Sequence, residues 1–303
     1  MLAEQKRLSK PLTSNGVVLD TSPRRLGELV SSDPQSPVAE LRAQYKKQGY
    51  LWLKGFFERQ EILAFRERFF SAFEGLGLLE PGTAPEAGIY SRETVDARAA
   101  NRALMEFIRT AAYESFCLHP KLWVFYDAFL EGPSYLHKRK IIRYTTPGGG
   151  RSTGAHYDLI YLRSGTDRVC SSWIPLGDTP LEMGGLAYLE GSDALGRKME
   201  ADFSELNRNL PRAEQIDAYN KNMGQGWLTK DLKTLAEKAE GRWLVADYEA
   251  GDMVIHSAYM IHAATDNTDP QNRLRLSTDI RYQNVRDEID ARWENHWSLE
   301  DML

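Results

Sequence analysis

Two histidines and one aspartate stand in an order that suits a metal site. His156 and Asp158 form a His-x-Asp pair in the segment GAHYDLIYL, and His262 follows much later in the segment GDMVIHSAYMIHAATDN. Two imidazoles and one carboxylate on one face of an iron(II) ion leave open positions for a cosubstrate and O2. These three residues therefore predict a non-heme iron centre that activates O2.

A downstream arginine adds a binding group for an organic cosubstrate. Arg275 stands two residues before Ser277 in the segment NRLRLSTDIRY. A guanidinium holds a carboxylate through two parallel hydrogen bonds, so Arg275 could anchor the far carboxylate of 2-oxoglutarate. Arg273 has the same parity on the predicted strand, and the pattern alone fits either arginine.

Each metal ligand also has a plainer interpretation. A lone His-x-Asp pair is common and by itself favours a structural hydrogen-bonded pair. On a strand, however, residues i and i+2 share a face, so His156 and Asp158 would point together into a barrel. His256 competes with His262 for the second imidazole, because both lie near the end of a probable strand. His256 suits a packed, hydrogen-bonded histidine, whereas His262 falls where a barrel mouth is expected and is the predicted ligand.

The elements that must position these residues fall into two regions. Apolar spacing and breaker residues predict helices and one short strand in the first region, with the helices at 38–48, 60–73, 95–116 and 120–130 and the strand at 49–53. After Pro133, short β-rich runs alternate with Gly, Pro, Asp and Asn, which is typical of a sandwich or barrel. We therefore expect an α+β protein with N-terminal helices packed against a jelly roll.

The predicted domain organisation is simple. Residues 1–37 are polar and punctuated by Pro and Ser, which indicates a partly extended N-terminal arm. Residues 38–303 form a single domain, with a β core at about 136–285 and a charged helical insertion at about 194–245. The insertion carries Trp227 and Trp243, and it is either a cover over the iron pocket or a surface subdomain with its own small core.

Composition and charge exclude several classes of protein. The 303 residues are 42% hydrophobic with a formal net charge of -5, which argues against a general nucleic-acid surface. The basic segment HKRK at 137–140 predicts a solvated strand entry. No apolar run approaches a membrane span, and the N-terminus lacks a signal-peptide core. The two cysteines, Cys117 and Cys170, are too few for a disulfide framework and favour the cytoplasm. The sequence leaves the oligomeric state open.

The order of the motifs resembles one family. The His-x-Asp pair is followed by DRVCSSWIPL, MGGLAYLEGS, GDMVIHSAYMIH and RLRLS, which is similar to the phytanoyl-CoA dioxygenase family of Fe(II)/2-oxoglutarate oxygenases. The resemblance spans roughly 141–282. It implies a double-stranded β-helix core of the cupin-like jelly-roll type, with iron held by His156, Asp158 and His262.

The resemblance also implies the residues around 2-oxoglutarate. The family arginine lies seven residues before an aromatic position that matches Tyr282, which selects Arg275. Ser277 would help to bind the same carboxylate, and Trp173 matches a family tryptophan near the cosubstrate, unless it only packs in the core. Two extra residues between His262 and the arginine depart from the commoner spacing, so Arg273 stays an alternative.

The implied activity uses Fe(II), 2-oxoglutarate and O2. The expected reaction is oxidation, most often hydroxylation, of an unactivated C–H bond in a small organic metabolite, in specialised biosynthesis. The alternative from another class is a cupin-like protein that binds a metal or a small molecule without oxygenase activity.

Overall fold

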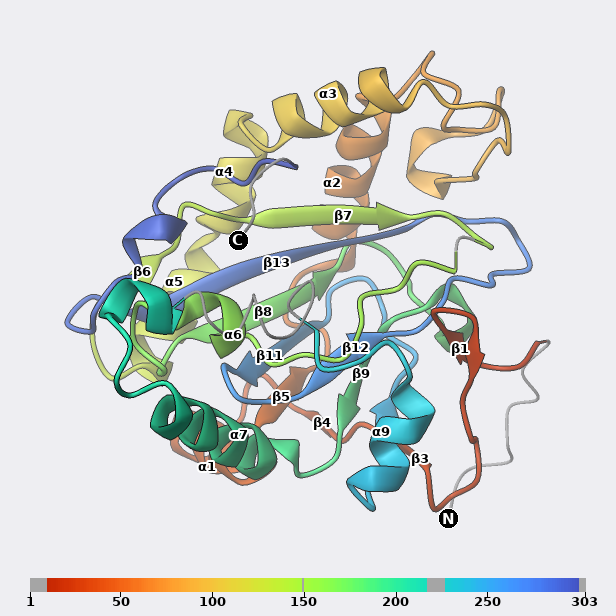
Figure 1. The fold of residues 1–303 in the computed structure, drawn as a ribbon. Helices are drawn as coiled ribbons and strands as arrows, with labels where there is room; N and C mark the ends of the chain where they lie inside the picture. The colour runs from red at the N-terminus through yellow and green to blue at the C-terminus, as the bar shows by residue number, and fades with distance from the viewer. Residues whose placement is uncertain (1–9, 149, 217–226, 300–303) are drawn as a thin grey trace.

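Two facing β-sheets form the centre of the protein (Figure 1). The computed structural model describes residues 10–148, 150–216 and 227–299. The larger sheet, called here the major sheet, has the order β4 (Ser31–Ser32), β5 (Tyr50–Leu53), β11 (Met253–Ser257), β8 (Cys170–Pro175), β13 (Arg275–Asn284) and β6 (Ser134–Leu136), with β7 (Ile141–Thr145) also paired to β13. The minor sheet has the order β12 (His262–Ala264), β9 (Leu186–Leu189), β10 (Trp243–Val245) and β3 (Leu26–Glu28).

The outer face of the major sheet is covered by helices. Leu276, Ile280 and Tyr282 alternate along β13 and join one buried cluster with residues of the helices that follow β5. These helices are α2 (Arg59–Ser71), α3 (Ala97–Phe107), α4 (Ala111–Cys117) and α5 (Pro120–Phe129), while α1 (Val38–Gln48) packs on β5 and α5. Burial of this face explains why three residues of one parity on β13 are apolar; Thr278, between them, is also buried and hydrogen-bonds to the Tyr113 hydroxyl.

The minor sheet is covered on its own outer face by α7 (Ser192–Leu206) and α9 (Leu232–Lys238), as Figure 1 shows. Phe203 of α7 and Leu232 of α9 share a buried cluster with Trp243 and Leu189 of the sheet. The inner faces of the two sheets meet around another cluster that includes Trp173 and Tyr188. The remaining short elements are the hairpin β1 (Thr13–Ser14) and β2 (Val17–Val18), helix α6 (Leu159–Leu162), and the 3-10 helices η1 (Pro85–Ala87), η2 (Leu181–Met183) and η3 (Ala291–Trp293).

The predicted α+β jelly roll with N-terminal helices is confirmed, and several local expectations differ. The single helix expected over 95–116 is wrong, because α3 ends at Phe107 and Thr110 caps the start of α4 by accepting a hydrogen bond from Tyr113 N. Within the expected N-terminal arm, β3 pairs with β10 and β4 pairs with β5, so this segment extends both sheets. The expected insertion at about 194–245 holds α7 and α9, but it ends in β10, a strand of the minor sheet.

The expectation of a solvated strand entry at 137–140 is wrong. His137, Arg139 and Lys140 are buried. The Arg139 guanidinium lies over the Trp293 ring, and His137 Nε2 is 2.8 Å from Gln283 Oε1. Burial lowers the pKa of His137 to about 4. The segment is covered because η3, far away in the sequence, folds back over it.

Arg66 of α2 is a buried guanidinium that holds the end of β8 to the start of β13. It donates hydrogen bonds to the carbonyl oxygens of Glu86, Leu176 and Leu274, over distances of 2.6, 3.2 and 2.9 Å. Burial, with a smaller effect of the Arg273 charge, lowers the pKa of Arg66 to about 10, and the carboxylate of Asp178 offsets this only in part.

We expect Arg66→Met to lower the free energy of unfolding by about 2–4 kcal/mol, because three carbonyl groups lose their donor in a buried place. Urea denaturation of the two proteins measures the difference. Arg68→Met, at an exposed position of the same helix, is the matched control and should change stability by less than about 0.5 kcal/mol. Equal stabilities for both variants would contradict the expected role of Arg66.

Candidate active site

The two predicted histidine ligands are direct neighbours in an antiparallel backbone pair. The backbone of His156 exchanges both hydrogen bonds with the backbone of His262, over N–O distances of 3.0 and 2.9 Å. This reciprocal pairing places the imidazole rings side by side, with centroids 4.3 Å apart. The structure therefore brings together two residues that are far apart in the sequence.

Each of these imidazoles is oriented by a backbone carbonyl. His156 Nδ1 donates to Gly154 O at 2.9 Å, and His262 Nδ1 donates to Met260 O at 2.9 Å. In a neutral ring these bonds put the proton on Nδ1 and leave the Nε2 lone pair free. Burial lowers the pKa of both histidines, most strongly that of His262, so the rings stay neutral. A neutral imidazole with a free lone pair is what a metal requires.

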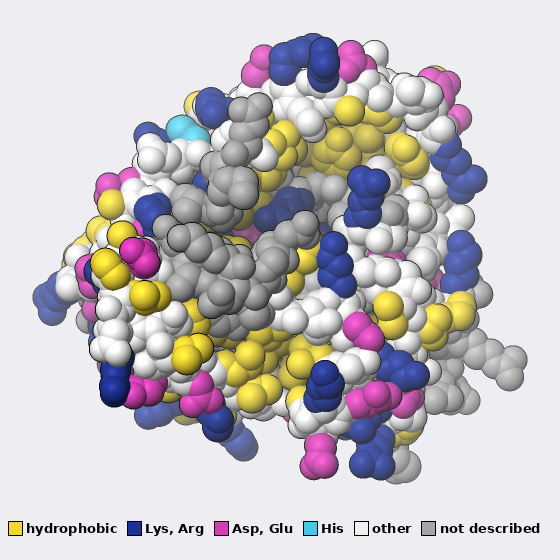
Figure 2. Space-filling view, in the orientation of Figure 1, with side chains coloured by type: hydrophobic (Ala, Val, Ile, Leu, Met, Phe, Trp, Pro, Cys, Tyr) yellow, Lys and Arg dark blue, Asp and Glu magenta, His cyan; other side chains and the backbone are white. Residues whose placement is uncertain are grey.

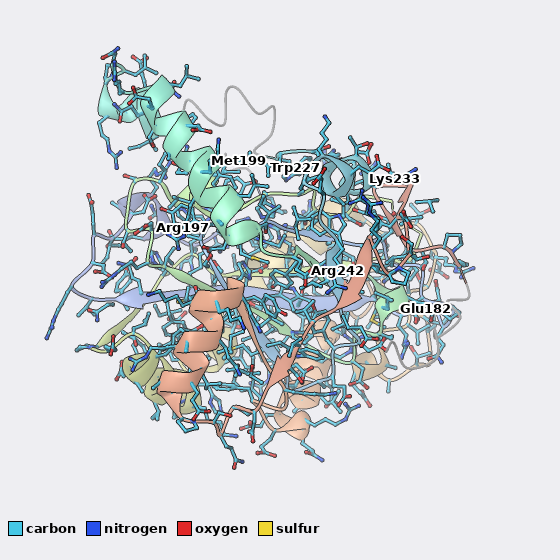
Figure 3. All side chains as sticks on the ribbon, turned by 90° about the horizontal axis from the view of Figure 1, so that it is seen from below. Glu182, Arg197, Met199, Trp227, Lys233 and Arg242 are labelled. Carbon is cyan, nitrogen blue, oxygen red and sulfur yellow. The ribbon has the colours of Figure 1, made fainter. Side chains whose placement is uncertain are left out.

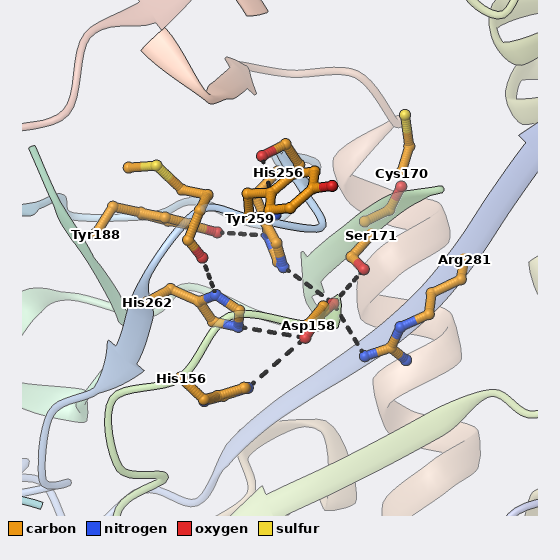
Figure 4. A network of polar contacts seen from close by, with 12 residues as sticks. His156, Asp158, Cys170, Ser171, Tyr188, His256, Tyr259, His262 and Arg281 are labelled. Atoms are coloured by element: carbon orange, nitrogen blue, oxygen red, sulfur yellow. Dashed lines mark hydrogen bonds and ion pairs between the residues drawn. The ribbon is translucent and has the colours of Figure 1, made fainter. Parts of the chain in front are cut away.

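Asp158 is buried at the start of α6, and its two carboxylate oxygens have different surroundings (Figure 4). Oδ2 accepts hydrogen bonds from Ser171 Oγ and, at 3.2 Å, from Arg281 Nη2. Oδ1 faces the histidines, 3.7 Å from His156 Nε2 and 3.8 Å from His262 Nε2. Burial alone would raise the pKa of Asp158, but Arg281 and His256 hold it well below the usual range.

The donor set fits a divalent metal ion. One ligand atom each from His156, Asp158 and His262 lies within 4.8 Å of the other two, and all three residues are buried. The second imidazole candidate, His256, lies on β11 with Nε2 3.5 Å from the other carboxylate oxygen, Asp158 Oδ2. Its Nδ1 is 3.1 Å from the Tyr188 hydroxyl. His256 therefore contacts the aspartate from the side away from His156.

The two arginine candidates for a carboxylate anchor lie in different surroundings. Arg273 is half-buried and already binds Asp269, with guanidinium–carboxylate distances of 3.0 and 2.8 Å. Arg275 is buried, donates from Nη1 to the Gly184 carbonyl, and keeps a buried Nε without a hydrogen-bond partner in the described part of the chain. Burial lowers the pKa of Arg275 to about 10. A buried cation of this kind is stabilised by an incoming anion.

Ser277 and Trp173 lie on the same inner face as Arg275. Ser277 is buried two residues along β13 from that arginine. Trp173 is buried on β8, directly across the ladder from Asp279, and its ring centroid is 4.8 Å from that of Tyr248. The inner face of β13 is thus polar and buried, whereas its outer face is apolar.

Two residues that contact Asp158 were not among the predicted site residues. Arg281 shares the strand parity of Arg275 and Ser277, so the alternation of β13 could have indicated it. Ser171 precedes Trp173 by two residues and shares its face. The Arg281 guanidinium lies 4.5 Å from the centre of the Trp293 ring, so η3 supports the arginine that holds the aspartate.

The segment between β9 and β10 contacts the His-x-Asp segment directly. The Tyr157 hydroxyl donates to Glu200 Oε2 of α7 at 3.0 Å, and Arg163 forms a buried two-pronged ion pair with the same carboxylate. The backbone of Thr229 pairs with that of Ala155. Figure 3 shows Trp227 between α7, which carries Met199, and α9, which carries Lys233. Trp243, in contrast, is buried in β10. Part of the expected insertion therefore lies beside the metal site.

A double-stranded β-helix with two histidines and one aspartate inside its barrel defines the class of non-heme iron oxygenases. Comparisons with known proteins identify the family within this class. The chain matches the phytanoyl-CoA dioxygenase (PhyH) family over residues 45–274. It is 26% identical over 247 residues to the 1-deoxypentalenic acid 11-beta-hydroxylase of Streptomyces arenae, and 24% identical over 246 residues to the protein of that name from Streptomyces exfoliatus. Each match covers 79% of this chain and 78% of the relative.

Solved structures share the fold. The non-heme alpha ketoglutarate dependent carbocyclase SnoK from nogalamycin biosynthesis superposes with a TM-score of 0.54 at 17% identity, covering 90% of this chain and 92% of the other. EctD from S. alaskensis gives a TM-score of 0.52 at 14% identity, with coverages of 96% and 92%.

The chain belongs to the phytanoyl-CoA dioxygenase family, as the order of its motifs predicted. It is an iron(II)- and 2-oxoglutarate-dependent dioxygenase, with O2 as the second cosubstrate. The alternative of a cupin-like binding protein without oxygenase activity is disfavoured by the family and by its hydroxylase relatives. Among the described residues, no helix is long and apolar enough to cross a bilayer.

Proposed function

We propose that the protein hydroxylates an unactivated C–H bond of a small organic metabolite in specialised biosynthesis. The observation that carries this proposal is the convergence of His156 Nε2, Asp158 Oδ1 and His262 Nε2 inside the barrel of a family dioxygenase. The two hydroxylase relatives, whose substrate is by name a carboxylic acid, support a small-molecule substrate. Cys117 and Cys170 are free and buried, which suits the reducing cytoplasm that we propose as the location.

The roles of the residues follow from their surroundings. His156, Asp158 and His262 would hold the iron(II), and the bound iron would supply the O2 activation that oxidises the substrate. Arg275, with Ser277, would bind the distal carboxylate of 2-oxoglutarate, because its buried Nε lacks a partner in the described region. Trp173 would limit the space beside the cosubstrate. The buried barrel interior excludes bulk water, which strengthens these charge contacts.

An anaerobic titration tests this function. Addition of Fe(II) and then 2-oxoglutarate to the purified protein should produce the weak visible charge-transfer band of the chelated cosubstrate. Admission of O2 with the substrate, or slowly without it, should convert 2-oxoglutarate to succinate. Metal binding without the band and without succinate would instead favour a binding protein of the cupin type.

A further inference from the structure

We propose that Arg143 binds a carboxylate or similar anionic group of the organic substrate at the mouth of the barrel. The inference rests on the proposed function and adds the chemical class of the substrate to it. Such a carboxylate could belong either to the substrate or to 2-oxoglutarate. The position of Arg143 indicates that it binds the carboxylate of the substrate.

Arg143 lies on the inner face of the major sheet. It is the middle residue of β7, and its register partner on β13 is Ser277. Directly paired residues of neighbouring strands point to the same face. Ile142 and Tyr144, its neighbours in the sequence, pack against the helix-covered outer cluster, so the Arg143 side chain projects to the opposite side.

Arg143 is exposed, whereas its neighbours on this face are buried or, for Thr145 and Asp279, half-buried. Arg275, Ser277 and Arg281 are all buried, whereas Arg143 is open to solvent. Arg143 is therefore the place where this face of β7 and β13 meets solvent. Figure 2 shows this side of the molecule, where Lys and Arg side chains lie in and around a hollow beside a group of hydrophobic side chains. A small molecule that enters the barrel here would meet apolar surface and positive charge together.

The guanidinium of Arg143 has no hydrogen bond or ion pair in the part of the chain that the structure describes. The two other arginines on this face are engaged, since Arg281 binds Asp158 and Arg275 is assigned to 2-oxoglutarate. Arg143 is nevertheless close to the site, because it pairs directly with Ser277, which lies two residues along β13 from Arg275.

Arg143 is exposed, whereas the residues proposed to bind 2-oxoglutarate are buried. One carboxylate of 2-oxoglutarate would lie at the metal and the other at the buried Arg275. Arg275 lies two residues along β13 from Ser277, the residue that pairs with Arg143. Arg143 is exposed, whereas Arg275 and the three ligand residues are buried, so it lies nearer to solvent than either carboxylate, on the side from which we expect the organic substrate to enter. An arginine at this place recognises a carboxylate by charge and by its two-pronged geometry.

A binding experiment with a simple amphipathic acid tests the inference. Octanoate serves as the charged probe and 1-octanol as its uncharged match. Both are titrated by calorimetry into the protein loaded with Mn(II) and 2-oxoglutarate, a form that does not turn over. The variants are Arg143→Gln, Arg143→Lys and the control Arg98→Gln, which changes an exposed arginine on α3, across the sheet from the site.

We expect octanoate to bind the wild type, and its Kd to rise about tenfold or more in Arg143→Gln and less in Arg143→Lys. The Kd of 1-octanol should not change, and Arg98→Gln should behave like the wild type. The Kd of 2-oxoglutarate, measured in the same preparations, should stay within threefold in all variants.

Three results would overturn the inference. The first is the absence of octanoate binding to the wild type, or equal binding to Arg143→Gln. The second is a tenfold weaker binding of 2-oxoglutarate to Arg143→Gln, which would assign the arginine to the cosubstrate. The third is failure of Mn(II) and 2-oxoglutarate to bind the wild type, which would refute the proposed function itself and is therefore distinguishable from the other two.

Discussion

His262→Ala should abolish turnover and weaken iron(II) binding by more than about 100-fold. Loss of a residue that only supports a metal ligand weakens binding by about 10- to 100-fold, so loss of a ligand should exceed that range. His262 offers a neutral Nε2 3.8 Å from Asp158 Oδ1, and one of its ring nitrogens lies within 4.8 Å of a ligand atom from each of the other two proposed ligands. Titration of the apoprotein with Fe(II) under anaerobic conditions measures the affinity, and succinate formation measures turnover.

His256→Ala is the matched control for this prediction. His256 contacts the other carboxylate oxygen of Asp158 and the Tyr188 hydroxyl, so its loss should lower stability and reduce metal affinity by about 10- to 100-fold at most. If His256→Ala lost the metal and His262→Ala retained it, the assignment of the second imidazole would be reversed.

Arg275→Lys should raise the Michaelis constant for 2-oxoglutarate about 10- to 100-fold and change that for the organic substrate little. Lysine keeps the charge but not the planar pair of donors that matches a carboxylate. Arg275→Met, which removes the charge as well, should have the larger effect, since truncating one partner of a buried charge pair costs about 2–5 kcal/mol. Initial rates at varied 2-oxoglutarate concentration provide both constants.

Arg273→Lys is the control for this second prediction. Arg273 is bound to Asp269 and is half-buried, so its replacement should alter the Michaelis constant for 2-oxoglutarate by less than about threefold. An effect of Arg273→Lys that equalled or exceeded that of Arg275→Lys would transfer the role to Arg273.

The sequence predicted those features that depend on local periodicity. The parity of β13 separated the polar residues that now face the barrel from the apolar ones that face the helices. The turn at the end of the last apolar run favoured His262 over His256 as the ligand, and this choice stays a prediction. The spacing His-x-Asp placed His156 and Asp158 in one site, as the 3.7 Å between their side chains shows.

Features that depend on contacts between distant segments could not be predicted in this way. The approach of Ser171 and Arg281 to Asp158 is fixed by the pairing of β8 with β13, which no local pattern encodes. The burial of Lys140, and its ion pair with Glu114 at 2.5 Å, depend on how β7 packs against α4. Helical periodicity also continued through Thr110, because a cap residue changes the backbone without changing the apolar spacing.

The position of β13 in the major sheet has a consequence for how the protein is made. This last strand pairs with β6, β7 and β8, all of which precede it by many residues, and it carries Arg275 and Arg281. A nascent chain therefore lacks the strand that joins β6, β7 and β8 until β13 has been synthesised. Such non-local pairing is slow to form. We therefore expect Arg281 to reach Asp158, and the iron site to take its final geometry, only after β13 has joined the sheet.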